Sequence, residues 1–128
     1  MELSDLKKWL DEYGRIWEQG DKEAVVDLYT DDVRYYETPF AEPYVGLEAV
    51  LGYARGAAAA QRDIRFTHNP YSITGDTGIA SWHASFVRVP SGVEVELDGV
   101  FVLQFDKNGK CRELREWWHR RETEGAQG

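Results

Sequence analysis

The chain has 128 residues, of which 42% are hydrophobic and 13% aromatic, so it can bury the core of one domain and is not disordered. Its formal charge is −8, and a negative field of this kind repels nucleic acid. Cys111 is the only cysteine, which excludes an intrachain disulfide. No apolar run approaches the ~20 residues that a membrane helix needs, and no signal-peptide core is present, so we expect a cytoplasmic protein without a membrane partner.

Two helices are predicted at the start of the chain. Apolar residues recur at spacings of three and four over residues 3–17, which is typical of an amphipathic helix. Ser4 is the expected N-cap of this helix, and Gly20 lies where a C-cap glycine belongs. Asp21 offers a second N-cap, and the apolar residues within 24–29 then predict a short second helix.

A short strand is predicted between the second and third helices. Residues 30–32 indicate a turn, and the β-branched and aromatic residues within 33–38 follow as a strand. Because side chains alternate along a strand, Tyr35 and Glu37 share one face. A loop between two prolines leads to the third helix, which begins at Leu47 and extends into an alanine run.

The remaining sequence has the two-residue period of strands. Turns are indicated at residues 75–78, 90–92 and 106–109. Strands are expected over residues 64–68, 79–89, 93–105 and 111–119. The polar tail, residues 121–128, is expected to fray. Three helices and consecutive strands predict one α+β domain over residues 1–128, with its core in about residues 4–120.

Alternation within these strands assigns side chains to faces. Trp82 and Phe86 share an apolar face, whereas Asp98 opposes the apolar face of its own strand. Gly99 suggests a bulge or bend. Glu116 shares a face with a leucine and a tryptophan, but both faces of its strand carry a tryptophan. The pattern therefore leaves two alternatives for Glu116, an inward carboxyl group or an outward one in an ion pair.

Four segments carry a resemblance to a known family, and the resemblance covers roughly residues 6–119. They are Tyr13…Trp17-Glu18-Gln19-Gly20-Asp21, Leu28-Tyr29-Thr30-Asp31-Asp32-Val33, Glu42-Pro43…Gly46 and Phe105-Asp106-Lys107-Asn108-Gly109-Lys110. In this order the chain resembles the nuclear-transport-factor-like superfamily, which includes SnoaL-like polyketide cyclases and ketosteroid isomerases. The resemblance implies a cone: three N-terminal helices on a strongly curved antiparallel or mixed sheet, with a pocket at the open end.

The resemblance and the residues together suggest a catalytic set. Glu37 lies where the ketosteroid isomerases have their general base, an Asp, and an inward carboxylate there loses hydration, which raises its pKa toward neutrality. The alternative is a carboxylate that caps the following loop. Tyr13 matches the tyrosine of the isomerase oxyanion hole, with a core aromatic as the alternative. An inward Glu116 would be a second pocket carboxyl group, and two such groups titrate apart.

One position departs from the isomerases. Phe101 lies where those enzymes have a protonated acid, so steroid isomerisation is not supported. The resemblance instead suggests an aromatic pocket wall for a flat hydrophobic ligand, with ordinary core packing as the alternative. The residues expected in this wall are Trp17, Tyr35, Phe40, Tyr53, Trp82, Phe86, Phe101 and Trp118. The three histidines lack zinc-ligand spacing, and no phosphate loop or nucleophile elbow occurs, so we expect no metal and no cofactor.

These observations favour a pocket protein for a small hydrophobic molecule. The first hypothesis is a cofactor-free enzyme that uses a carboxylate to move protons on a carbonyl-like substrate, of the isomerase, cyclase or dehydratase type. The first alternative is a domain that binds a small ligand without changing it. The second is an assembly domain that forms a homodimer through the outer sheet face, which has apolar character. That face carries Ser85, Val87, Val100, Val102 and Trp117.

Overall fold

The computed structural model describes residues 1–123, so the end of the tail that we expected to fray, residues 124–128, lies outside the described residues. Two α-helices, one short 3-10 helix and six strands make up the described chain. In order they are α1 (Leu3–Gln19), η1 (Lys22–Asp27), β1 (Tyr29–Tyr36), β2 (Tyr44–Val45), α2 (Leu47–Ala60), β3 (Gln61–Thr74), β4 (Thr77–Arg88), β5 (Glu94–Phe105) and β6 (Cys111–Thr123).

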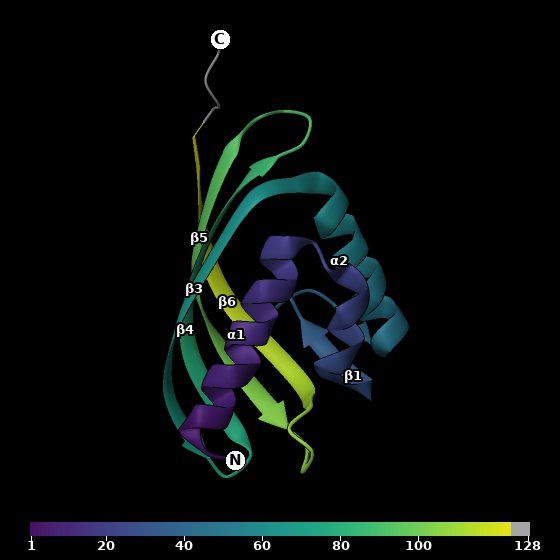
Figure 1. Ribbon diagram of the computed structural model, residues 1–128, viewed down its shortest axis with the longest axis vertical. Helices are drawn as coiled ribbons and strands as arrows, with labels where there is room; N and C mark the ends of the chain where they lie inside the picture. Colours follow the sequence, from purple (N-terminus) through teal and green to yellow (C-terminus); the bar gives the residue numbers. More distant parts are fainter. Residues whose placement is uncertain (124–128) are drawn as a thin grey trace.

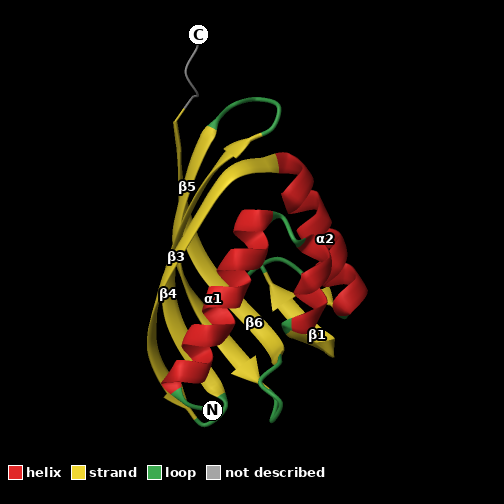
Figure 2. Ribbon diagram, viewed as in Figure 1, coloured by secondary structure: helices red, strands yellow, loops and turns green. Residues whose placement is uncertain are grey.

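The six strands form one mixed sheet in the order β2-β1-β6-β5-β4-β3. Strands β1 and β6 are parallel, and the other neighbouring pairs are antiparallel. The long strands β3 to β6 bend together, and α1 and α2 lie on the hollow side of the sheet (Figure 1). Figure 2 shows the same separation, with the helices in one layer and the curved sheet in the other. The predicted α+β class, with three helices on a curved mixed sheet, is confirmed.

Helix α1 ends as the sequence predicts and begins differently. Gly20 has the left-handed φ of 65° that glycine adopts freely, and it closes the helix. The predicted N-cap at Ser4 is wrong, because the helix already begins at Leu3. Glu2 and Asp5 form a reciprocal capping box there, in which each side chain accepts a backbone N–H bond from the other residue.

Two predicted irregularities are also corrected. Residues 30–32 are not a turn but the irregular first half of β1, where the register against β6 shifts between Tyr29 and Arg34. Gly99 forms no bulge, because its pairing with Trp118 lies in an uninterrupted stretch of the β5–β6 ladder. A side chain at this position would collide with the Trp117 carbonyl oxygen and approach the Trp82 ring to 3.0 Å, so close packing explains the glycine.

The core lies between α1 and the concave face of the sheet. Leu6 and Leu10 of α1 are fully buried against this face, which contributes Phe101, Leu103 and Phe105 from β5. Hydrophobic burial of this kind drives the amphipathic helix onto the sheet. This core fills the end of the molecule near the N-terminus, and toward the other end of α1 the packing gives way to a cavity.

Candidate active site

A cavity of about 350 Å³ opens between the helices and the concave face of the sheet. Its wall is mostly aromatic and aliphatic, which suits an apolar ligand of modest size. Residues from α1, η1, α2 and strands β1, β3, β4, β5 and β6 contribute to it. The residues singled out by sequence that line it are Tyr13, Trp17, Tyr35, Glu37, Tyr53, Trp82, Phe86, Glu116 and Trp118.

Two expected wall residues lie elsewhere. Phe40 is fully exposed, because β1 ends at Tyr36 and strand alternation no longer directs the side chains of the following loop. Phe101 does point inward, but it is buried in the core and does not reach the cavity. The rings of Tyr13 and Trp82 cover it, with centroids at 5.4 Å and 5.2 Å. The prediction that Phe40 and Phe101 line the cavity is therefore wrong.

Glu116 faces inward from β6, which resolves the two alternatives left by the sequence. It is only 6% exposed, and its carboxyl group makes no hydrogen bond within residues 1–123. Burial in this apolar surrounding raises the pKa of the Glu116 carboxyl well above its ordinary value, and the negative charge of Glu37 raises it further. The position of Glu116 therefore favours the protonated form of its carboxyl group, the form that can donate a hydrogen bond.

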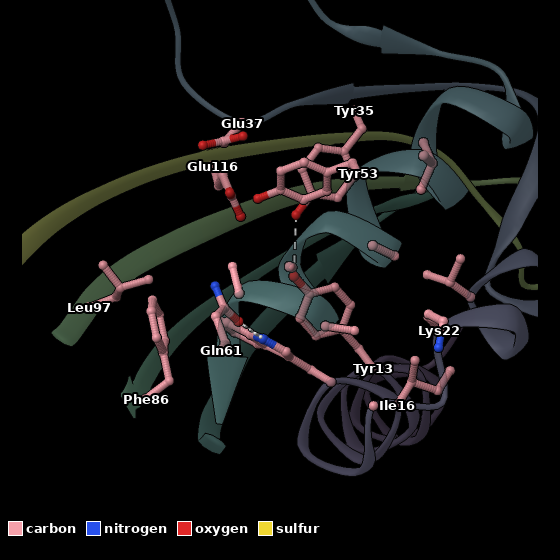
Figure 3. Close-up of a pocket in the computed structure, with 18 of the residues that line it drawn as sticks. Tyr13, Ile16, Lys22, Tyr35, Glu37, Tyr53, Gln61, Phe86, Leu97 and Glu116 are labelled. Carbon is pink, nitrogen blue, oxygen red and sulfur yellow. Dashed lines mark hydrogen bonds between the residues drawn. The ribbon is translucent and has the colours of Figure 1, made fainter. Parts of the chain in front are cut away.

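Glu37 is the first residue after β1 and is partly buried at the same cavity. Its backbone carbonyl accepts a hydrogen bond of 2.9 Å from the indole Nε1 of Trp118, which ties the end of β1 to β6. Figure 3 shows the carboxyl groups of Glu37 and Glu116 on the same side of the cavity. The two carboxyl groups therefore lie at one cavity, an arrangement that the sequence left open because it did not decide the face of Glu116.

Three tyrosines add phenol groups to the cavity. The hydroxyls of Tyr13 and Tyr35 lie 3.3 Å apart and share one hydrogen bond. In Figure 3 the hydroxyl of Tyr53 points toward the side occupied by Glu116. Burial raises the pKa of all three phenols, and the charge that Glu116 would carry adds to the effect. They are therefore neutral groups, able to donate hydrogen bonds to an oxygen atom of a ligand.

Other parts of the wall are not among the residues predicted from the sequence. Alanines at the end of α2 leave room where larger side chains would fill the cavity, and Ala57 and Ala58 are among them. The cluster of alanines in the sequence is a signal for such room, although it also fits an ordinary helix. Gln61 also lines the cavity, directly after α2. A single glutamine at a helix end gives no signal in one sequence.

The outer sheet face carries a separate polar cluster. His83 lies between two carboxylates, with Nε2 2.9 Å from Glu96 and Nδ1 3.2 Å from Asp98. Asp98 thus faces outward, in agreement with strand parity.

No group of three or more potential metal ligands occurs within residues 1–123. Within the same residues, no helix has both the length and the apolar character for a membrane crossing.

Together, the curved mixed sheet, the covering helices and the cavity between them define a cone-shaped α+β domain. Residues 10–114 match a family model described as a SnoaL-like domain, and the chain therefore belongs to the SnoaL-like domain family. The resemblance to the nuclear-transport-factor-like superfamily is thereby confirmed.

A solved structure supports the fold independently. The chain is similar to SalBIII, described as an epoxide hydrolase/cyclase-like enzyme with a role in pyran ring formation in the polyether salinomycin. The TM-score is 0.78, with 20% sequence identity, over 88% of this chain and 89% of that one. At this identity the match establishes the cone-shaped fold alone.

Proposed function

We propose that the protein is a cofactor-free enzyme that moves a proton within a hydrophobic, carbonyl-containing small molecule. The observation that supports this proposal most is the presence of two carboxyl groups, Glu37 and Glu116, at one aromatic cavity. Two acids in one apolar recess hold their protons unequally, so one can act as an acid while the other acts as a base.

The buried position of Glu116 supports the role of the acid. Burial and the nearby Glu37 raise the pKa of its carboxyl group, which favours the protonated form, and in that form Glu116 would donate a hydrogen bond to the carbonyl oxygen of the substrate. Glu37 would act as the base and take a proton from the carbon next to that carbonyl. The electron pair of the broken C–H bond then forms the enol double bond, and the carbonyl oxygen gains negative charge.

The second half of the reaction reverses these transfers. Glu37 returns its proton to the same carbon or to another carbon of the conjugated system, and the carbonyl bond re-forms. Return to a different carbon is an isomerisation. Cyclisation and dehydration need the same two proton transfers, the removal of one proton and the delivery of another. They therefore belong to the same proposal. The ring-forming role described for SalBIII supports the inclusion of cyclisation.

The proposal can be tested by deuterium exchange into 2-tetralone, a flat ketone with acidic C–H bonds that is small enough for the cavity. Proton NMR would follow the exchange with wild type, Glu37→Gln and Glu116→Gln. We expect Glu37→Gln to lose about 10²-fold or more of the protein-dependent rate, and Glu116→Gln to lose less. Glu113→Gln is the matched control, because Glu113 lies on β6 and does not line the cavity. Equal rates for all four proteins would contradict the proposal.

A binding domain without catalysis is the second candidate. Two observations favour it: Phe101 replaces the protonated acid of the isomerases, and the hydroxyl of Tyr13 is already bonded to Tyr35. Such a domain would copurify with a ligand that it leaves unchanged. Mass spectrometry of the extracted ligand, before and after incubation with fresh protein, distinguishes the two candidates, because turnover of the ligand excludes the binding domain.

We also propose that the outer sheet face forms a homodimer. Val100 and Trp117 are direct neighbours across the β5–β6 ladder, and they are 37% and 45% exposed. Such neighbouring apolar side chains favour a partner surface. Sedimentation velocity should show a dimer for wild type and a monomer for Trp117→Lys. A wild-type monomer at micromolar concentration would contradict the dimer and leave the proposed activity unaffected.

A further inference from the structure

Gln61 is held in one orientation at the cavity wall. It is the first residue of β3, directly after α2, and its Oε1 accepts a hydrogen bond of 2.7 Å from the indole Nε1 of Trp17. An indole nitrogen can only donate, so the amide atom that faces it must be the oxygen. The amide nitrogen of Gln61 is therefore directed away from Trp17.

The indole that fixes this amide is itself held in place. The ring of Trp17 packs against those of Phe66, Trp82 and Phe86, with centroids 5.8 Å, 6.4 Å and 6.3 Å away. Rotation of the Gln61 amide would bring its NH₂ group against the indole N–H and leave two donors facing each other. The orientation is thus set by packing and by hydrogen-bond chemistry together.

The amide nitrogen of Gln61 faces the cavity. In Figure 3 it points into the space below Glu116, on the opposite side from the Trp17 bond. It makes no hydrogen bond within residues 1–123, although the wall around it is largely apolar. Its N–H groups are therefore available to an oxygen acceptor of a ligand in the cavity.

We propose that Gln61 is a ligand-binding residue whose amide N–H groups select molecules with an oxygen acceptor, such as a ketone, ester or ether. Its Oε1 is already used by Trp17, so a ligand group that can only donate gains nothing there. The inference deepens the proposed function, because it rests on this cavity being the substrate site and names an acceptor-bearing substrate class. Tyr13 and Tyr53 would supply further donors to the same ligand.

The test compares two probes that differ in one oxygen, the ketone 2-tetralone and the hydrocarbon tetralin. Tryptophan fluorescence reports the binding of both, because Trp17, Trp82 and Trp118 line the cavity. Gln61→Met removes the donor at similar size. Gln61→Glu keeps an acceptor for Trp17 and, at pH 8, replaces the NH₂ group with an oxygen. Gln104→Leu is the control, because Gln104 lies on β5 and does not line the cavity.

We expect both Gln61 variants to bind tetralin as wild type does and to lose about 3- to 10-fold in affinity for 2-tetralone. The side-chain amide NMR signals of Gln61 should also move when 2-tetralone is added and stay in place with tetralin. An unchanged ratio of ketone to hydrocarbon affinity in both variants would overturn the inference. This test measures binding and needs no turnover, so it is independent of the proposed activity. If the protein prefers 2-tetralone through Gln61 but catalyses no deuterium exchange, the proposed activity is contradicted and the role of Gln61 in binding is supported.

Discussion

The buried carboxyl group of Glu116 should make the free energy of unfolding depend on pH. Its pKa in the folded protein lies well above the ordinary value of 4.5, because the carboxyl group is buried and Glu37 is near. Above pH 4.5 the unfolded chain releases this proton, whereas the folded protein retains it. A rise in pH between the ordinary and the raised pKa therefore favours the unfolded state, and the contribution of Glu116 to the free energy of unfolding falls.

Glu116→Gln removes this pH dependence, because glutamine does not titrate. Each pH unit within the window costs the wild type up to about 1.4 kcal/mol. Allowing for partial protonation of the unfolded chain near pH 5, the stability difference between variant and wild type should grow by about 1 kcal/mol from pH 5 to pH 6. Urea denaturation followed by tryptophan fluorescence, at half-unit pH steps, measures this difference directly.

The slope of the difference matters more than its value at one pH, because glutamine and a protonated carboxyl group also differ in size and hydrogen bonding. Glu23→Gln provides a control of opposite sign. The exposed pair with Arg55 holds the pKa of Glu23 below its ordinary value, so this variant should become less stable relative to wild type as pH rises from acid. A stability difference for Glu116→Gln that stays constant from pH 5 to pH 6 would refute the reasoning.

Three further predictions follow from packing and burial. Gly99→Ala should destabilise the protein by about 1–3 kcal/mol, because the added methyl group meets the Trp117 carbonyl and the Trp82 ring. Gly52→Ala should instead stabilise it by about 1 kcal/mol, because this exposed position in α2 has open space around it. Urea denaturation measures both changes in the free energy of unfolding. Changes of the same sign for the two variants would contradict the packing argument. Burial raises the pKa of the Cys111 thiol, so Ellman's reagent should react with it only after the protein is unfolded. Rapid reaction of the native protein would contradict its burial.

Much of the fold follows from periodicity. The helical spacing in α1 and the glycine that ends it identify the helix, because a left-handed C-cap strongly favours glycine. Strand alternation then gives the faces of β4 and β5. It also allows an inward Glu116, although only packing against the helices decides between the two faces of β6.

Sequence-based predictions are wrong where local rules compete with tertiary contacts. Residues 30–32 resemble a turn in composition, yet they lie within β1, between the positions Tyr29 and Arg34 that pair with β6. Phe40 follows the end of that strand, so alternation no longer applies to it. Phe101 faces inward as expected, but the depth of a side chain depends on which rings cover it, and periodicity contains no information on depth. The role of Gln61 depends on a contact 44 residues away in the sequence.

A carbon-13 NMR titration of the glutamate carboxyl groups tests the central claim most directly. Glu116→Gln identifies the signal of Glu116 by its disappearance. We predict that this signal remains that of a protonated carboxyl group well above pH 4.5, and that Glu37→Gln moves its titration to lower pH by removing a nearby negative charge. A Glu116 signal that titrates at the ordinary value, with or without Glu37, would contradict a neutral acid held in the cavity.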